Sequence, residues 1–491
     1  MAFNSISVDL GATSGRVVLA KLDNGKLELE EVHRFPNGFS TIAGRTYCNL
    51  YYLFDEIRKG LKKVGSRGIE VASIGVDTWG VDVVCVGSDG HILSQPRAYR
   101  DPYTDGMMEE YFKIVPKDEV YRRTGIQFMN FNTLFQLFTL HREGNSSLEA
   151  ADRVLFLPDA LSFLMTGNMV CEYTILSTSQ FLNPYDKKID EGLLEAAGID
   201  PDLFPGIVMP GHVVGPLTDE LARETGLGPV RVIAVAGHDT GSAVAAVPAT
   251  TKNFAYLSSG TWSLIGIEAY EPIIGEESFK ENYTNEGGID GTIRFLKNVT
   301  GMWLLEQCRV RWAEQGKDYS YPQIVEMMGQ AKPFVSFVDP DDPVFAAPDD
   351  MEKAIKDYCR SHGEAVPEDD KALVRCIFES LALKYRNVID TLNSKFVKEP
   401  IEVLHIIGGG SKNALLNQIT ANATKLRVLA GPSEATTIGN VMIQARAAGI
   451  VNTKEEMRAL IGRSITLEEY LPQDTELWDA AYKRFKEIIS K

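Results

Sequence analysis

The chain has 491 residues, of which 44% are hydrophobic, and it carries a formal net charge of −17 at pH 7. A chain of this length is expected to form more than one folding unit, at roughly 100–200 residues each. An acidic surface repels nucleic acid and anionic membranes, because both are bound through basic patches. We therefore expect no nucleic-acid partner and no membrane association.

The cysteines and the N-terminus indicate a reducing compartment. No C-x-x-C pair is present, and no histidines stand at zinc-ligand spacing. We expect Cys359 and Cys376 to lie on facing helices as reduced thiols. The first residues, MAFNSISVDLG, lack the basic and apolar regions of a signal peptide, and no apolar run approaches the ~20 residues of a membrane-spanning helix. A cytoplasmic location is the expectation.

The first half of the chain begins with a predicted three-stranded meander, in which Asn24-Gly25 is a strong two-residue hairpin signal. A strand pair is expected around the segment DTWGVD, and a strand, a polar turn and a helix are expected across residues 230–247. The remaining apolar patterns predict strands at 5–10, 16–21, 26–35 and 154–157, and helices at 50–64, 134–140 and 160–165.

The second half opens with another predicted hairpin, and its turn resembles the first turn of the chain. Residues 5–20 and 253–268 are both strand–turn–strand units with glycine and hydroxyl residues at the turn. We therefore predict two domains, 1–247 and 248–491, divided at the sequence VPATT. Further predicted elements are a hairpin at 254–267 and strands at 403–407 and 427–430. Helices are predicted at 372–393 and 474–489, and two more are predicted between them, one that begins at 413 and one that ends near 449.

Two glycine-containing turns are candidate phosphate sites. In the first, Asp9–Arg16 (DLGATSGR), glycines let backbone N–H groups approach an anion, while hydroxyl side chains and an arginine add donors. The carboxylate of Asp9 at the strand end suits a water-coordinated Mg²⁺. The second turn is Leu257–Ser263 (LSSGTWS). Taken alone, each of the two segments also fits an ordinary hairpin turn that binds no ligand. Two such turns that face each other would clamp the phosphates of a nucleotide.

The segment Gly237–Gly241 (GHDTG) is the candidate for catalysis. Asp239 follows a wholly apolar strand, so its carboxylate stands at the mouth of a buried element and is placed to accept a proton from a substrate hydroxyl. An aspartate at the start of a helix also serves as a simple cap. His238 alone would more often be a hydrogen-bonded structural histidine.

Two further motifs carry weaker signals. The glycine run Gly408–Gly410 follows a buried strand and allows a ring or a phosphate to approach the backbone, but it matches neither the P-loop nor the dinucleotide-binding spacing. The segment Asp77–Asp82 places an aromatic face and carboxylates between two strands. It predicts either a sugar platform or a tight hairpin with an exposed tryptophan.

Together, these five motifs, in their order along the chain, resemble the FGGY family of carbohydrate kinases, which includes kinases for glycerol, xylulose and gluconate. The resemblance covers nearly the whole chain. Segments such as IGVDTWGVD, AYRDPYT, AGHDTGSAV, TNEGG and HIIGGGSKNALLNQ are similar to the branch of the family that phosphorylates L-rhamnulose. Ala12 and Gly15 stand where the wider family often has Thr and Ser, a departure that points away from glycerol kinase.

The resemblance implies an α/β fold with two ribonuclease-H-like, actin-like ATPase domains around a central cleft. It implies that Asp239 is the catalytic base, that Mg²⁺ is organised by Asp9, and that ATP is the co-substrate. The implied sugar contacts are Gly80, His238, Asp239, Thr240 and Asn298. The implied nucleotide contacts are Ala12, Thr13, Ser14, Gly15, Arg16, Thr261, Glu306 and Gly409.

The implied reaction is phosphorylation of the 1-hydroxyl of L-rhamnulose, with a small sugar and ATP as the partners of a monomer or homodimer. One alternative is a kinase for another ketose, such as L-fuculose or xylulose. A second is a non-catalytic actin-like nucleotide-binding protein. A repressor is disfavoured, because no basic helix-turn-helix extension is visible in the sequence.

Overall fold

The N-terminal meander forms one side of a six-stranded sheet in the computed structural model, which describes residues 2–346 and 348–490. The strand order is β13–β14–β6–β1–β2–β3. β1 runs antiparallel to β2 and parallel to β6, and β6 runs parallel to β14. The strands are β1 (Phe3–Leu10), β2 (Ser14–Asp23), β3 (Lys26–Pro36), β6 (Ser73–Thr78), β13 (His212–Pro216) and β14 (Arg231–Ala234).

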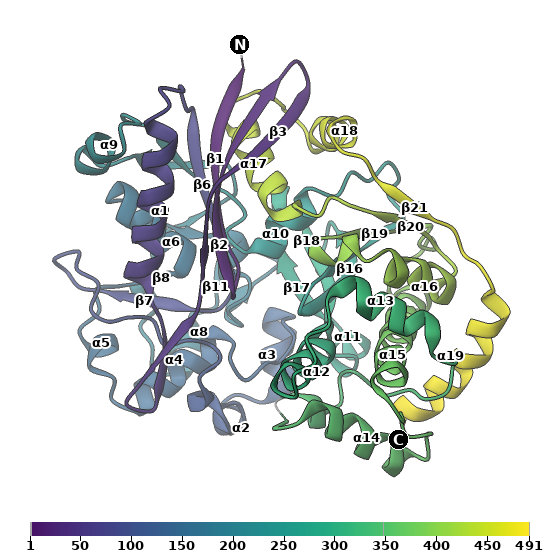
Figure 1. Cartoon of the computed structure of the whole chain (residues 1–491). Helices are drawn as coiled ribbons and strands as arrows, with labels where there is room; N and C mark the ends of the chain where they lie inside the picture. Colours follow the sequence, from purple (N-terminus) through teal and green to yellow (C-terminus); the bar gives the residue numbers. More distant parts are fainter. Residues whose placement is uncertain (1, 347, 491) are drawn as a thin grey trace. The chain divides into compact units, whose positions relative to one another are not determined.

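Helices cover both faces of this sheet (Figure 1). α1 and α6 pack on one face, and α10 and α17 pack on the other. α1 begins at the cap Asn49, whose side chain accepts the Tyr52 N–H, and buries the apolar stripe predicted from its spacing. The helices here are α1 (Leu50–Gly65), α6 (Leu157–Thr166), α9 (Asp219–Thr225), α10 (Asp239–Ala245), α17 (Ala435–Ala447) and α18 (Lys454–Ser464).

A second hydrophobic cluster gathers the short elements that follow β6, and it is rich in aromatic side chains such as Tyr111, Phe135 and Phe181. Its helices are α2 (Met107–Phe112), α3 (Lys117–Thr124), α4 (Thr133–Arg142), α5 (Ser146–Glu149), α7 (Tyr173–Leu176), α8 (Glu191–Ala196) and α11 (Glu276–Lys280). Two-stranded sheets join β4 (Phe39–Ile42) to β5 (Arg45–Cys48), β7 (Val83–Val86) to β8 (Arg153–Phe156), β9 (Cys171–Glu172) to β12 (Ile207–Val208), and β10 (Leu182–Asn183) to β11 (Lys188–Ile189).

The predicted strand pair around DTWGVD is wrong. β6 pairs with β1 and β14, whereas β7 pairs with β8 in a separate sheet. Val81 has a positive φ of 71°, so the chain turns sharply between the two strands and β7 leaves the main sheet.

A seven-stranded sheet is built mainly from the second half of the chain, in the order β17–β18–β16–β15–β19–β20–β21. β15 and β16 form the predicted hairpin, and β15, β19 and β20 run parallel. The strands are β15 (Phe254–Ser259), β16 (Trp262–Ala269), β17 (Thr284–Gly287), β18 (Ile293–Thr300), β19 (Val403–Ile407), β20 (Arg427–Ala430) and β21 (Glu468–Tyr470).

The long helix α15 contributes the largest buried face of this half, from Leu373 to Ile389. Cys359 and Cys376 lie in α14 and α15, and all six cysteines of the chain are buried free thiols, in agreement with the sequence prediction. The helices are α12 (Trp303–Glu314), α13 (Tyr321–Gln330), α14 (Met351–His362), α15 (Asp370–Thr391), α16 (Ala414–Thr424) and α19 (Thr475–Ile489).

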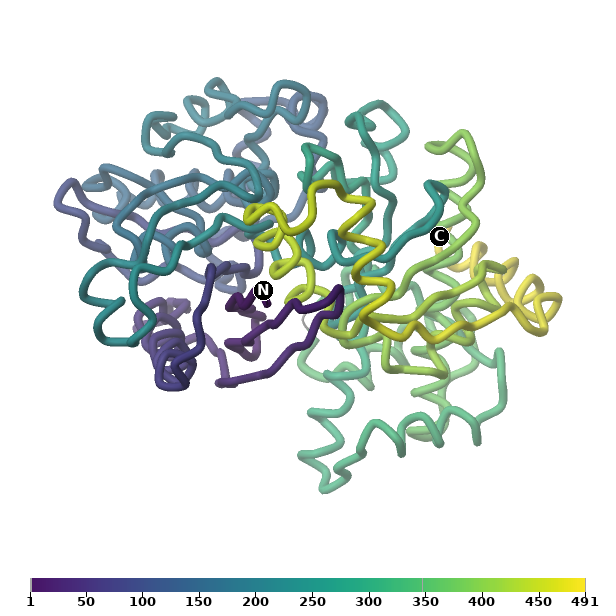
Figure 2. Tube along the Cα trace, turned by 90° about the horizontal axis from the view of Figure 1, so that it is seen from above, coloured from purple at the N-terminus to yellow at the C-terminus, as the bar shows by residue number. Residues whose placement is uncertain are grey.

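By their contacts the residues form two compact units whose sequences interleave. The first contains 1–250, 268–295 and 435–465, and the second contains 251–267, 296–434 and 466–491. Figure 2 shows the yellow-green segment with α17 and α18 beside the purple N-terminal strands, where α17 contacts β1 and α18 contacts β3. Among the described residues, no helix is long and apolar enough to cross a membrane.

Candidate active site

The candidate site of the first unit lies at the carboxyl ends of three neighbouring parallel strands. β1 ends beside Asp9, β6 ends beside Asp77, and β14 leads into the turn before Asp239. Asp9 and Asp77 are direct partners in the β1–β6 register, and the Thr78 N–H donates to the Gly237 carbonyl at 2.9 Å. In α/β sheets this edge is where ligands bind, so the topology gathers the acidic side chains at a suitable place.

Asp9 is held by three hydrogen bonds to its Oδ2 atom. Arg16 is its partner in the β1–β2 register and donates from Nε at 3.0 Å and from Nη2 at 2.7 Å. The Thr437 hydroxyl of α17 donates to the same oxygen at 3.0 Å. The arginine predicted to contact the nucleotide thus also fixes the carboxylate predicted to organise the metal.

The turn between β1 and β2 is closed by backbone contacts. The Gly11 N–H donates to the Ser14 carbonyl at 2.9 Å, and the Asn37 N–H donates to the Thr13 carbonyl at 2.9 Å. The Thr13 side chain is exposed at its tip. A Cβ atom at Gly15 would lie 2.4 Å from the Phe35 ring, so packing against β3 requires glycine at this position.

Asp77 is fully buried, and burial together with the charge of Asp9 raises its pKa well above the ordinary range. Its Oδ2 accepts a hydrogen bond from Asn440 Nδ2 at 2.5 Å, and its Oδ1 has no hydrogen-bond partner within the described part of the chain. Thr437 and Asn440 lie on α17, and each is more than 350 residues along the sequence from the aspartate that it contacts. Sequence reasoning missed both, because no local pattern marks a contact of that separation.

The Asp9–Asp77 pair fits the Mg²⁺ ion that the predicted reaction implies. The ion takes one or two protein carboxylates and completes its coordination with water and phosphate oxygens. Two carboxylates at matching positions of adjacent strands, one with an unpartnered oxygen, meet that requirement. The described residues hold no group of three or more His, Cys, Asp or Glu side chains that could bind a metal.

Asp239 is the first residue of α10, and His238 is its N-cap. The Asp239 Oδ1 accepts hydrogen bonds from the Thr240 N–H at 2.6 Å and the Thr240 hydroxyl at 3.2 Å. The side chain keeps 32% of its surface exposed. Burial raises its pKa above the ordinary range, an effect that His238 reduces and the charge of Asp9 increases. A partly accessible carboxylate with a raised pKa is a suitable general base.

The imidazole of His238 lies between three charged groups. Its Nε2 is 3.5 Å from Asp239 Oδ1, and its Nδ1 is 3.2 Å from Glu286 Oε2 and 3.1 Å from Arg294 Nη2. The turn that carries His238 is itself fixed, because the Gly237 N–H donates to the buried Glu172 carboxylate at 2.9 Å. Sequence reasoning included Glu286 in the segment TNEGG but assigned no role to it or to Arg294.

Both predictions for the ring of Trp79, a platform for the sugar and an exposed tryptophan in a tight hairpin, are wrong, because the side chain is buried. Trp79 is only 7% exposed, its Nε1 donates to Asp82 Oδ2 at 2.8 Å, and its ring packs on Phe39 with centroids 6.0 Å apart. Its face is therefore part of the core. At Gly80 a Cβ atom would lie 3.2 Å from the Thr178 side chain, so the backbone there approaches its neighbour closely.

Four predicted site residues lie in the second unit. The turn of Thr261 and the glycine run meet because β15 pairs with β19, and a Cβ atom at Gly410 would lie 2.1 Å from the Ser259 hydroxyl. Thr261 and Gly409 are exposed near this contact, and Asn298 is half-buried on β18. Glu306, near the start of α12, accepts from Arg309 at 2.9 Å and from the Tyr321 hydroxyl.

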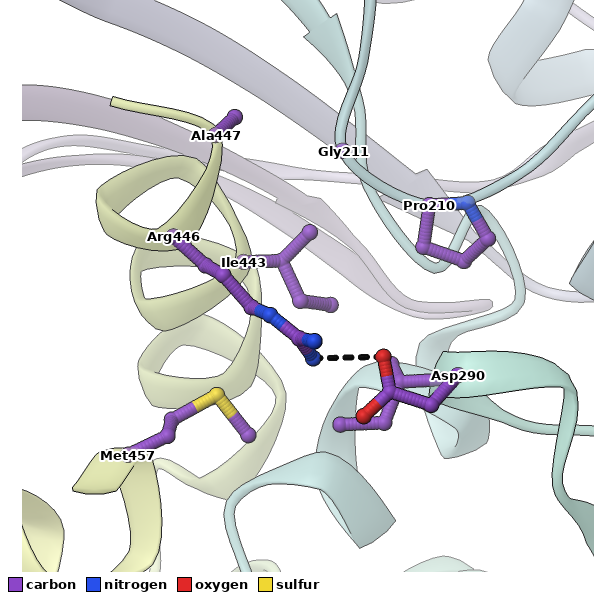
Figure 3. Close-up of a pocket in the computed structure, with 8 residues that line it drawn as sticks. Pro210, Gly211, Asp290, Ile443, Arg446, Ala447 and Met457 are labelled. Carbon is purple, nitrogen blue, oxygen red and sulfur yellow. Dashed lines mark ion pairs between the residues drawn. The ribbon is translucent and has the colours of Figure 1, made fainter. Parts of the chain in front are cut away.

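A separate cavity of about 200 Å³ lies beside α17 in the first unit (Figure 3). Arg446 reaches across it to Asp290, with an ion pair of 2.6 Å, and the apolar side chains of Ile443 and Met457 are among the other residues that line it. None of the predicted site residues lines this cavity.

Comparison with known proteins agrees with the motifs. Models of the FGGY family of carbohydrate kinases match residues 5–246 (N-terminal domain) and 255–448 (C-terminal domain). The rhamnulokinase of Bacteroides thetaiotaomicron is 55% identical over 489 residues, 100% of each chain, and that of Ligilactobacillus salivarius is 42% identical over 486 residues, 99% of each. The crystal structure of gluconate kinase from Lactobacillus acidophilus matches with a TM-score of 0.82 at 17% identity, covering 100% of this chain and 98% of that one.

The fold and the family models therefore define a carbohydrate kinase with the actin-like ATPase fold, as the sequence predicted. More particularly, the chain belongs to the FGGY family of carbohydrate kinases.

Proposed function

We propose that this chain transfers the γ-phosphoryl group of ATP to the 1-hydroxyl of L-rhamnulose, giving L-rhamnulose 1-phosphate and ADP. The substrate follows from the names of the full-length relatives, which are rhamnulokinases. The structural observation that carries the chemistry is the Asp239 carboxylate. It is partly exposed at the N-terminus of α10, and it stands at the sheet edge where Asp9 also ends its strand.

In this mechanism Asp239 accepts the proton of the sugar hydroxyl while the bond from that oxygen to phosphorus forms and the bond from phosphorus to the ADP oxygen breaks. The raised pKa of Asp239, which burial causes, makes it a stronger base than an exposed aspartate. Asp9, with Asp77 beside it, would hold Mg²⁺ through water, and the ion supplies positive charge to the phosphoryl oxygens.

The other site residues are assigned by chemistry and family resemblance. We propose that Gly80, His238, Thr240 and Asn298 contact the sugar. We propose that Ala12, Thr13, Ser14, Gly15, Arg16, Thr261, Glu306 and Gly409 contact the nucleotide. Along the chain, residues 1–247 would form the sugar-binding domain with the first phosphate turn, and residues 248–491 the nucleotide-binding domain. We also propose that the protein is located in the cytoplasm and acts as a monomer or homodimer.

The substrate is tested by ADP release from the purified chain with ATP and Mg²⁺ against a panel of L-rhamnulose, L-fuculose, xylulose and glycerol. We expect the highest kcat/KM with L-rhamnulose. A higher value for another ketose would replace the substrate but leave the class of reaction unchanged. ADP release that no sugar stimulates, together with tight ATP binding, would favour a non-catalytic nucleotide-binding protein.

A further inference from the structure

A short segment of the first unit is fully buried although it carries four polar side chains. Residues 172–178 comprise α7, the residue before it and the two residues after it, and none of them is more than 6% exposed. The polar side chains are those of Glu172, Thr174, Ser177 and Thr178. Because buried polar groups need hydrogen-bond partners, their partners show which parts of the fold this segment holds together.

Each of the three hydroxyl groups donates its proton within the segment. Thr174 donates to the Glu172 carboxylate at 2.6 Å. Ser177 donates to the Thr174 carbonyl at 2.6 Å, and Thr178 donates to the Ile175 carbonyl at 2.8 Å. A hydroxyl group has one proton and two lone pairs, so each of these groups can only accept hydrogen bonds from the rest of the fold.

The first hydroxyl holds the turn that leads to the candidate base. Thr174 accepts the backbone N–H of His238 at 3.3 Å, and Glu172 accepts the N–H of Gly237 at 2.9 Å. Backbone N–H groups only donate, so the direction of both bonds is fixed. Two consecutive residues of the turn before Asp239 are therefore tied to this segment.

The second hydroxyl holds the end of β17. Ser177 accepts the Gly287 N–H at 2.7 Å, and a Cβ atom at Gly287 would lie 2.5 Å from the Tyr173 ring. The residue before it, Glu286, places its carboxylate 3.2 Å from the imidazole of His238, which is a predicted sugar contact. The segment therefore also fixes the strand that reaches this side of the candidate site.

The third hydroxyl holds the turn after β6. Thr178 accepts the Val81 N–H at 3.3 Å, directly after the predicted sugar contact Gly80. A Cβ atom at Gly80 would lie 3.2 Å from the Thr178 side chain, so the backbone passes close to it. The three hydroxyl groups thus reach three parts of the chain that are far apart in sequence, and each bond ends in or beside the candidate sugar site.

We infer that segment 172–178 is a positioning element of the sugar site, whose hydroxyl groups set the spacing between the turn of Asp239 and the backbone around Gly80 and Gly287. The inference rests on the proposed function and deepens it, because it names residues that act on the sugar without touching it. Displacement of a catalytic group by about 1 Å can cost on the order of 10²-fold in rate. None of the bonds described above reaches a predicted nucleotide contact, so the effect should be specific to the sugar.

The decisive variant is Thr174→Val, which keeps the shape of the side chain and removes the acceptor of the His238 N–H. We expect kcat for L-rhamnulose to fall about tenfold or more, with KM for ATP unchanged within about twofold, because the turn of Asp239 loses an anchor. Thr174→Ser keeps the hydroxyl and should retain kcat within about threefold of the wild type. Equal losses in the two variants would show that packing rather than the hydroxyl group matters, and would overturn the inference.

Ser177→Ala and Thr178→Val test the two segments that do not carry the base. We expect each to raise KM for L-rhamnulose about threefold or more, with a smaller change in kcat. An equal rise in KM for ATP would contradict the assignment to the sugar site. If Thr174→Val does not fold, these two variants decide the question in its place.

A matched control separates positioning from stability. Thr225 at the end of α9 is another buried threonine of the first unit, and its hydroxyl donates to the Leu221 carbonyl at 2.7 Å and accepts the Leu227 N–H at 3.5 Å. Neither partner is a predicted site residue. We expect Thr225→Val to lower the melting temperature as Thr174→Val does, while kcat and both KM values stay as in the wild type. A loss of kcat in Thr225→Val that equals the loss in Thr174→Val would overturn the inference.

Hydrogen–deuterium exchange, followed by mass spectrometry, tests the bonds without a substrate. In Thr174→Val we expect faster exchange in the peptide that contains Gly237 and His238, and in Thr225→Val an unchanged rate there. Uniformly faster exchange along the whole of the Thr174→Val chain would show that the hydroxyl serves stability alone, and would overturn the inference. If the wild type turns over no sugar, the proposed function fails, and the exchange rates still decide whether segment 172–178 holds the turn.

Discussion

At the scale of single residues, Asp239 links an electrostatic property to a measurable rate. Burial raises its pKa, and the catalytic form is the carboxylate, so activity is lost as pH falls through that raised value. We expect the acidic limb of kcat to lie above the ordinary aspartate range of about 3.9. Asp239→Asn should lower kcat on the order of 10²–10⁴-fold and abolish this limb, as ADP release across pH would show. A near-normal rate in this variant would remove Asp239 from the role of base.

Asp82 makes a second prediction at this scale, for stability rather than catalysis. Burial raises its pKa to about 7, so the folded chain holds a proton that the unfolded chain releases near pH 3.9. The stability that this proton contributes is fully present below about pH 4 and is lost as pH rises through about 7, a change of roughly 4 kcal/mol.

Asp82→Asn keeps an oxygen to accept the Trp79 indole N–H and removes the titration. We therefore expect the variant to gain stability over the wild type as pH rises from 5 to 8, measured by urea unfolding. A constant difference between the two proteins across this range would contradict the assignment.

At the scale of elements, the sequence predicted the strands and helices that have a strong local period. The hairpin Phe254–Ile267, the strand Val403–Ile407 and the helix from Leu50 all form where their patterns placed them. The pairing of β6 was not predictable in the same way. Val76 and Val83 have similar β-branched surroundings, but the chain turns at Val81, where φ is positive, and the second strand pairs with β8 instead.

The contacts that α17 makes with the site could not be predicted from local sequence patterns. Its buried, Gly-containing sequence predicts a packed helix, but nothing in it marks Thr437 as a donor to Asp9 or Asn440 as a donor to Asp77. Gly439 is the residue that allows α17 to approach α10 closely. A Cβ atom at Gly439 would lie 1.8 Å from the Ser242 carbonyl oxygen, so α10 and α17 touch backbone to backbone.

Gly439→Ala should therefore push α17 away from α10. We expect a loss of about 1–3 kcal/mol of stability, because the new methyl group has no space, and a lower kcat, because the Thr437 and Asn440 contacts to Asp9 and Asp77 lengthen. Chemical denaturation and ADP-release kinetics measure the two effects.

The control is Gly329→Ala in α13, where nothing lies within 4 Å of the new Cβ atom. That change should stabilise the chain by up to about 1 kcal/mol, since alanine favours a helix more than glycine does. Equal effects of the two substitutions would show that helix propensity, not the contact between α10 and α17, decides the result.

At the scale of the whole molecule, the first unit is not continuous in sequence. The sequence predicts a boundary near residue 247, whereas α17 and the β17 segment return to the first unit from the second half of the chain. Val441 and Met442 of α17 are fully buried, and Gln444 donates to the Ile6 carbonyl at 3.0 Å. Interleaving of this kind depends on contacts hundreds of residues apart, which a single sequence does not display.

A fragment of residues 1–247 should consequently fail to fold on its own. Without α17, the face of β1 and β6 that this helix covers is exposed, and Asp77 loses the Asn440 amide while remaining next to Asp9. We expect the fragment to bind a hydrophobic dye and to melt without a cooperative transition, whereas the full chain melts sharply under the same conditions. Adding a peptide of residues 435–465 should restore part of the cooperativity, because it supplies the missing face. A sharp melt of the fragment alone, near the temperature of the full chain, would show that the returning helix adds little to the stability of the first unit.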